Sequence, residues 1–118
     1  MKDLIEQYLE LAQKHGEYTL NGDSINGNKI HSKMMKVIAQ IKSKPKEIHK
    51  LFYKTIEHEN DSVKMWTATA LLKTNENESI KTLKQVAKTS KTIHGLTAKT
   101  TLDCWKKGML TDITNWNE

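Results

Sequence analysis

The chain has 118 residues, of which 36% are hydrophobic, with a mean hydropathy of -0.68 and a net charge of +5. This length predicts a single domain, and one proline with five glycines is too few for the many turns of an all-β fold. A single cysteine, Cys104, excludes an intrachain disulfide, which fits a reducing cytoplasm. We therefore expect an all-α fold of helices joined by short loops.

The positive charge comes from 19 lysines, because the sequence contains no arginine. Lysine offers a point charge, whereas arginine supplies the planar fork that reads phosphate and guanine, so the composition is a weak sign of nucleic-acid binding. The segment 1–16 carries acids within its apolar pattern and has no continuous apolar run of the signal-peptide kind. No stretch reaches the roughly 20 apolar residues of a membrane span. We expect a cytoplasmic protein without a membrane partner.

Two amphipathic helices are predicted in the first part of the chain. Apolar side chains recur at helical spacing over residues 3–18, and Gly16 lies near the expected end of this helix. The residues 21–24 read Asn-Gly-Asp-Ser, which is typical of a turn followed by a helix cap. A second helix then runs to about residue 43, and two Asn and a Gly weaken its first turns.

A third and a fourth helix follow. Pro45 suits the first turn of the third, where its missing N–H costs nothing. The stretch 61–73 is nearly apolar on all sides, and a helix without a wide polar face must be covered on more than one side. We therefore predict a central helix here, capped by Asp61 and Ser62, with Trp66 in the core.

The last part of the chain predicts two helices and a tail. The fifth helix starts after residue 75, and a sixth begins near Thr92. Gly108 marks its end, because glycine suits the position after a helix and the two lysines before it suit a helix C-terminus. Trp116 lies in the polar tail that follows. It either packs back onto the sixth helix or is exposed as an anchor for a partner.

Two parts of the sequence match when one is shifted along the other. With a shift of 30 residues the matching pairs are Val63 with Ile93, Trp66 with Leu96, Thr67 with Thr97, Ala68 with Ala98 and Leu72 with Leu102. Small residues coincide as well as large ones. We predict that 45–73 and 77–107 are two copies of a helix–turn–helix unit with Trp66 between them, that 3–43 is a divergent third pair, and that 108–118 is a tail.

Two segments carry a resemblance to known repeat proteins. They read His58-Glu59-Asn60-Asp61-Ser62-Val63-Lys64-Met65-Trp66-Thr67-Ala68 and Thr101-Leu102-Asp103-Cys104-Trp105-Lys106-Lys107-Gly108. On these residues the chain resembles HEAT-like and armadillo-like α-solenoids, and more closely a family of short bacterial helical-repeat proteins classed as a domain of unknown function. The resemblance implies an α-α superhelix of about six helices in three antiparallel pairs, without catalytic residues. Some proteins of this kind are immunity proteins that block a toxin.

Residue types that hold metals or carry catalysis form no local constellation. No two of the five histidines lie three or four positions apart, and the sequence lacks the CxxC, HExxH, GxSxG and glycine-rich phosphate-binding motifs. Cys104 lies late in a helix, where a half-buried structural thiol is expected rather than a nucleophile. We predict no enzymatic activity, no cofactor and no metal site. An enzyme of another type would need a deep pocket with converging polar groups.

We predict instead a protein-binding module, with an immunity protein as one form of it. The expected binding surface is the groove lined by the second helix of each pair. The candidate partner-binding residues are Lys64, Thr67, Lys73, His94, Thr97, Thr101 and Trp116.

Lysine-rich faces leave a second function open, which is binding of a nucleic acid by a HEAT-like protein. The candidate polyanion-binding residues are Lys29, Lys33 and Lys36 on the second helix and Lys81, Lys84 and Lys88 on the fifth. A solvated outer face also explains these lysines. No aromatic residue is interleaved with them, which argues against stacking on single-stranded bases.

Overall fold

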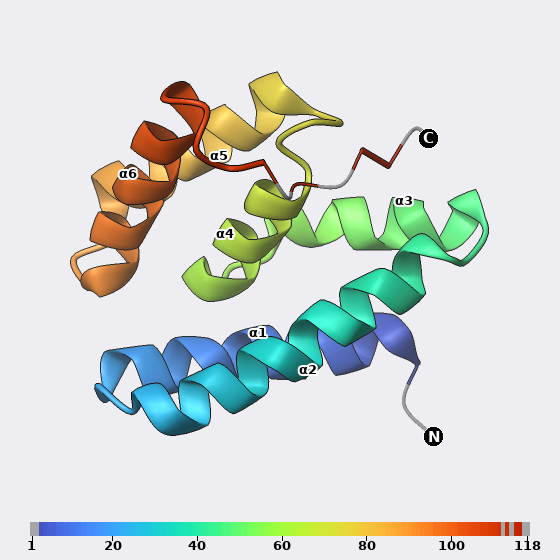
Figure 1. Cartoon of the computed structure of the whole chain (residues 1–118), viewed down its shortest axis with the longest axis horizontal. Coiled ribbons are helices and arrows are strands. Elements are labelled where there is room, and N and C mark those ends of the chain that lie inside the picture. The colour runs from blue at the N-terminus through green and yellow to red at the C-terminus, as the bar shows by residue number, and fades with distance from the viewer. Residues whose placement is uncertain (1–2, 112, 114, 117–118) are drawn as a thin grey trace.

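The computed structural model describes residues 3–111, 113, 115 and 116, and every regular element in that part of the chain is helical. The predicted all-α class is confirmed. The elements are α1 (Leu4–Leu20), α2 (Ser24–Lys42), α3 (Lys46–Lys54), the short 3-10 turn η1 (Thr55–Glu57), α4 (Asp61–Ala70), α5 (Glu76–Thr89) and α6 (Ile93–Lys106). Figure 1 shows the α1–α2 hairpin along one side, the α5–α6 hairpin at the opposite side, and α3 and α4 between them. This arrangement fits a helical bundle or a short superhelix.

Helix starts follow the capping signals of the sequence. The side chains of Asp3, Asp23 and Thr92 accept hydrogen bonds from backbone N–H groups in the first turns of α1, α2 and α6. The predicted cap of α4 was one residue too late. Asn60 is the N-cap, and its side-chain oxygen accepts from the N–H of Ser62 at 3.0 Å and of Val63 at 3.2 Å.

Gly16 lies inside α1, which continues to Leu20, a little past the predicted end at residue 18. The glycine is buried where α1 crosses the start of α4. A Cβ atom at this position would lie 2.7 Å from the Cβ of Ser62, and the Ser62 hydroxyl donates to the Ala12 carbonyl at 2.7 Å. The missing side chain therefore lets two helix backbones approach closely, instead of breaking a helix.

Two clusters of buried side chains make up the core, and α4 contributes to both. The first cluster joins α1, α2, α3 and the start of α4, and its largest side chains are Tyr8, Met34, Ile41, Phe52 and Trp116. The second joins α4, α5 and α6, and consists of Met65, Ala68, Leu72, Leu83, Val86, Ala98 and Leu102. The central position predicted for the stretch 61–73 is therefore correct, although α4 itself ends at Ala70.

A chain of three buried hydroxyl groups crosses the first cluster. The Tyr8 hydroxyl lies 2.7 Å from Thr67 Oγ1, and Thr67 Oγ1 lies 2.6 Å from Thr55 Oγ1. The Thr55 hydroxyl also donates to the Phe52 carbonyl at 2.7 Å, and the Tyr8 hydroxyl to the Val63 carbonyl at 3.2 Å. Burial raises the pKa of Tyr8 far above its usual value. The chain links α1, η1 and α4 through polar groups that are all satisfied.

Tyr8→Phe should destabilise the fold by about 1 kcal/mol, because it removes two net-favourable hydrogen bonds but leaves Thr67 bonded to Thr55. Urea denaturation of Tyr8→Phe, of Thr67→Val and of the double variant measures the coupling between the two hydroxyls. Losses that simply add would contradict a direct bond between Tyr8 and Thr67.

The two predicted repeat copies share only part of their packing. Ala68 on α4 and its match Ala98 on α6 are both buried. Val63 is buried against the α1–α2 hairpin, whereas its match Ile93 is 47% exposed at the start of α6. The internal repeat therefore stays a prediction.

Candidate functional site

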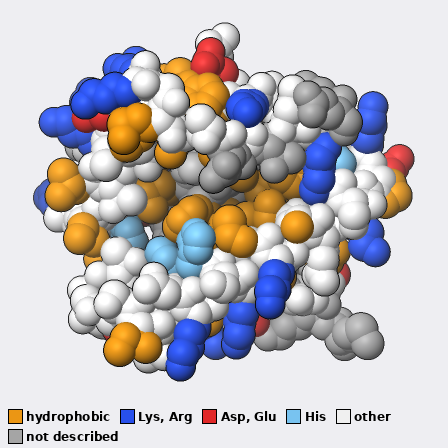
Figure 2. All heavy atoms as spheres, in the orientation of Figure 1, with side chains coloured by type: hydrophobic (Ala, Val, Ile, Leu, Met, Phe, Trp, Pro, Cys, Tyr) orange, Lys and Arg blue, Asp and Glu red, His pale blue; other side chains and the backbone are white. Residues whose placement is uncertain are grey.

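An apolar groove lies between α2 and α4, beneath the chain segment that follows α6. It encloses a hollow of about 250 Å³. The lining residues are Met35 and Ile38 of α2, Trp66, Thr69 and Ala70 of α4, and Met109, Leu110, Thr111, Ile113 and Trp116 of the following segment. Figure 2 shows hydrophobic side chains gathered across the middle of this face. We call this hollow and its lining the α2–α4 groove.

Three exposed lysines stand on α2, outside the lining of the groove. Lys29, Lys33 and Lys36 are all exposed, as the helical spacing predicted. Figure 2 shows Lys side chains in a row on the α2 side of the face. The other predicted set, Lys81, Lys84 and Lys88, is also exposed, but it lies on α5. Lys33 and Lys36 line a separate hollow with residues of α1, so the positive charge of α2 lies outside the apolar groove.

Trp66 was predicted to lie between the second and third helix pairs. It contacts the first helix pair instead. Its ring centroid lies 5.2 Å from that of His15 on α1 and 5.2 Å from that of His31 on α2. The indole is partly buried, and its Nε1 atom is shielded from solvent without a hydrogen-bond partner among the described residues. Trp66 therefore forms the link between the α2–α4 groove and a cluster of histidines.

The histidine cluster lies where the α1–α2 hairpin meets α4 and α6. The rings of His15 and His31 are 5.9 Å apart, and His94 is 6% exposed with a buried Nδ1 atom that no described residue contacts by a hydrogen bond. Burial lowers the pKa of His15 and of His94, and the charges of His31 and His94 lower that of His15 further. Asp61 acts on His94 in the opposite direction. The folded protein therefore favours the neutral forms of His15 and His94.

We expect the protein to lose stability as the pH falls below about 6.5. An imidazole in the unfolded chain takes up its proton near pH 6.5, whereas His15 and His94 in the folded chain take it up only at lower pH. The unfolded state then binds more protons, so acid favours unfolding, and the effect vanishes at higher pH where both states are neutral. Urea denaturation at about pH 7.5 and about pH 5.5 measures the difference.

His15→Gln and His94→Gln should each reduce this loss on acidification. His58→Gln is the matched control, because it removes an imidazole from the turn before α4. Equal acid sensitivity of the wild type and all three variants would contradict a role for the cluster.

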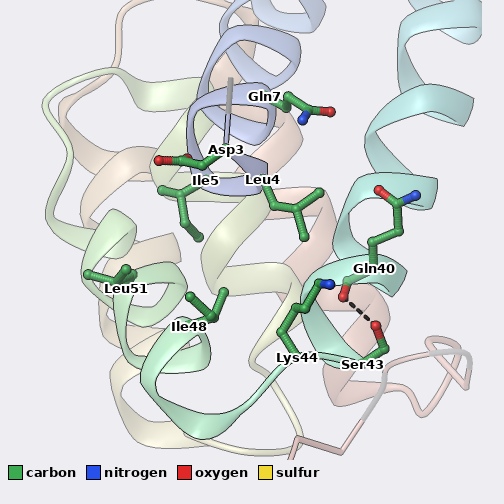
Figure 3. A pocket seen from close by; sticks show the side chains of 9 residues that line it. All are labelled: Asp3, Leu4, Ile5, Gln7, Gln40, Ser43, Lys44, Ile48 and Leu51. Carbon is green, nitrogen blue, oxygen red and sulfur yellow. Dashed lines mark hydrogen bonds between the residues drawn. The ribbon is translucent and has the colours of Figure 1, made fainter. Parts of the chain in front are cut away.

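A larger hollow of about 530 Å³ lies between the start of α1, the end of α2 and α3. Figure 3 shows Leu4, Ile5 and Ile48 pointing into it from two helices. Ser43, at its rim, donates its hydroxyl to the Gln40 carbonyl at 2.6 Å. Its apolar lining suits an apolar side chain of another molecule.

Metal-ligating residues are dispersed in the part of the chain that the structure describes, where no three His, Cys, Asp or Glu side chains are placed to hold a metal ion. Cys104 is a free thiol of intermediate exposure, as predicted. None of the described helices combines the length and the apolar character needed to cross a bilayer.

Three of the predicted partner-binding residues are buried in the folded chain, and their role in partner binding stays a prediction. Thr67 belongs to the buried hydroxyl chain. His94 belongs to the histidine cluster. Trp116 packs against α3 and the end of α4. The two predicted alternatives were packing on the sixth helix and exposure to solvent, and its position differs from both.

The remaining predicted residues differ in their exposure. Lys73 is exposed just after α4, and Lys64 is partly buried near the start of the same helix. The hydroxyls of Thr97 and Thr101 donate to carbonyls of α6 itself, at 3.1 and 2.9 Å. No α6 side chain lines the α2–α4 groove, whereas the predicted groove included the sixth helix.

Sequence reasoning missed several residues of this face. Met35 was not among the residues that the sequence singled out, yet it lines the groove. His15 and His31 are 16 positions apart, so no local spacing indicates that they meet. Both lie at facing positions of the α1–α2 hairpin. Pairing the residues of two predicted helices across their turn would therefore have brought the two histidines together.

Comparisons of the chain with protein-family models, with curated proteins and with solved structures found no significant match.

Proposed function

We propose that this chain is a protein-binding module whose α2–α4 groove receives an apolar part of a partner, with the lysines of α2 contacting acidic residues around it. The observation that carries the proposal is an apolar hollow lined in part by α2, with three exposed lysines on the same helix. Interfaces commonly combine an apolar centre with a polar rim, and complementary charge speeds association. An immunity protein that blocks a toxin is one form that such a module takes.

Affinity capture from the source cells, followed by calorimetry on the captured pair, tests this function. We expect a stoichiometric protein partner. Lys29→Glu, Lys33→Glu and Lys36→Glu combined should weaken its binding by about tenfold or more at low salt, because they reverse the charge on the exposed surface of α2. Met35→Asp should weaken it as well, because it places a charge in the groove.

The matched control reverses the three lysines of α5, Lys81, Lys84 and Lys88, which are equally exposed but lie away from the groove. It should bind like the wild type. Absence of a stoichiometric partner, or equal weakening by both triple variants, would contradict recognition through this face.

Duplex DNA is the second candidate ligand, and the row of Lys29, Lys33 and Lys36 is the observation that favours it. Binding to phosphates releases counterions, so affinity would fall steeply between about 50 and 200 mM salt. Fluorescence anisotropy with a labelled duplex distinguishes the two functions. We expect weak binding that never saturates, and a saturable, steeply salt-dependent complex would favour the nucleic-acid function instead.

A further inference from the structure

Trp116 is held like a ligand in a site built by other elements. It is 3% exposed, and its indole stacks on Phe52 with ring centroids 5.0 Å apart and an interplanar angle of 22°. His49 and Tyr53, on the same helix, meet it edge to face at 5.1 and 6.1 Å. Three rings of α3 thus surround one indole, and aromatic contacts of this kind add to the burial of apolar area.

Two hydrogen bonds fix the position of this tryptophan. The indole Nε1 donates to the carbonyl of Ala70 at 3.1 Å, and the backbone N–H of Trp116 donates to the Thr74 hydroxyl at 2.8 Å. Ala70 is the last residue of α4, and carbonyls in a last helical turn lack partners within the helix. We call His49, Phe52, Tyr53, Ala70 and Thr74 the Trp116 socket. It recognises both the side chain and the backbone of its occupant.

The socket is formed by residues that the rest of the fold already positions. Phe52 is fully buried and packs edge to face on Tyr8 of α1, with ring centroids 4.9 Å apart. The segment that delivers Trp116 begins at Gly108, whose positive φ of 72° ends the helical course, and Met109 after it is 64% exposed. The occupant is therefore joined to the fold through a short irregular connection, whereas its site lies on helices.

The delivering segment also leaves space beside it. The hollow of about 250 Å³ in the α2–α4 groove lies between this segment and the helices, and Ile113 and Trp116 both line it. Figure 1 shows the segment crossing from α6 over α4 toward α3. The groove and the socket are therefore continuous, and the chain's own segment fills only part of them.

We propose that the Trp116 socket is a recognition site for an extended protein segment bearing a tryptophan, which the chain's own segment occupies until a partner's segment of the same kind displaces it. The chemistry of the present occupant supplies the argument for this ligand. It carries an apolar residue three positions before a tryptophan, Ile113 and Trp116. The inference rests on the proposed binding function, since the partner reaches the socket along the α2–α4 groove.

The covalent link between the resident segment and the fold determines how tightly another segment must bind to displace it. A segment linked by a short connection competes as though it were present at about millimolar concentration. A free segment must therefore bind more tightly than the resident one, or be presented by a partner already bound at the groove. The wild type should accordingly show little affinity for a short free peptide.

The test uses the full-length Trp116→Ala variant and a fluorescein-labelled peptide with the sequence of residues 107–118. We expect saturable anisotropy binding to the variant and a rise in its Tm with peptide concentration, since a ligand of the folded state stabilises it. The same peptide carrying Trp116→Ala should bind about tenfold more weakly or worse, because it lacks the anchor. The wild type should not bind either peptide at the same concentrations.

A folded Trp116→Ala variant that ignores the peptide at millimolar concentration would overturn the proposal and leave Trp116 as a core residue only. If this variant does not fold alone, the peptide should restore its helical circular dichroism. Trp116→Leu, which keeps apolar volume in the socket, provides a second folded variant. If the peptide neither displaces the leucine of this variant nor refolds the alanine variant, the proposal is also overturned.

Sedimentation of the wild type separates a foreign segment from a second copy of the chain. We expect a monomer, and a dimer that dissociates on addition of the peptide would overturn a foreign occupant in favour of a second copy. The peptide assay involves neither the lysines of α2 nor the captured partner. Its failure therefore leaves the proposed function standing, and failure of the lysine variants leaves the socket standing.

Discussion

Gly16→Ala is expected to destabilise the fold by about 1–3 kcal/mol, although alanine is the better helix former. The added Cβ would lie 2.7 Å from the Cβ and 3.0 Å from the Oγ of Ser62 on α4. Neither atom is the far end of a flexible side chain, so α1 and α4 must move apart, and overpacking of this kind costs more than the helix propensity gained. Urea denaturation measures the loss as a shift in the midpoint at constant slope.

Gly27→Ala is the matched control within the same hairpin. Gly27 is also buried and helical, but its Cβ would meet only the Cβ of Tyr18 at 3.8 Å, an ordinary contact distance. This variant should be stabilised by about 0.5–1 kcal/mol. Ser62→Gly in the Gly16→Ala background should recover part of the loss. If Gly16→Ala proved as stable as Gly27→Ala, close contact at Gly16 would not hold the two helices in place.

Trp116→Ala should cost about 3–5 kcal/mol of stability, which is the range for removing a large buried aromatic side chain. The variant loses the ring contacts with α3 and both the volume and the hydrogen bond that the indole supplies at the end of α4. The Ala70 carbonyl also loses its donor in a site that the segment shields from solvent. Chemical denaturation followed by circular dichroism measures the change.

Trp105→Ala is the control for loss of a tryptophan as such. Trp105 is partly buried on α6, and its Nε1 donates to the Glu76 carboxylate at 2.9 Å in an exposed position. Its removal should cost about 1–2 kcal/mol, less than that of Trp116. Equal losses for the two variants would contradict a structural role for the socket.

Periodicity and capping predicted the helices well because both are local. The start of the sixth helix near Thr92 and the place of Gly108 after its end were predicted correctly, since each depends on neighbours within one helical turn. The close contact at Gly16 was not predicted, because a glycine near the end of a helical stretch occurs both as a helix stop and as a close helix contact. Only the position of Ser62, 46 residues later, separates the two uses.

The candidate site was less accessible to prediction, because it depends on contacts between distant residues. Thr67 reads as a polar residue suited to a surface, yet Tyr8 and Thr55 satisfy its hydroxyl inside the core. Trp116 lies in a polar stretch, and its burial depends on rings of α3 about 60 residues earlier. The lysines of α2 were predictable as exposed, since a helical stripe of lysines needs no partner.

The participation of Trp116 in the same buried cluster as Tyr8 has a consequence for biosynthesis. Translation runs from the N-terminus, so α1 and α3 leave the ribosome well before residue 116 is joined to the chain. Until then the face of Phe52 that receives the indole is uncovered, and the nascent polypeptide presents an apolar surface of the kind that chaperones bind. This half of the molecule therefore reaches its native state only after synthesis of nearly the whole chain.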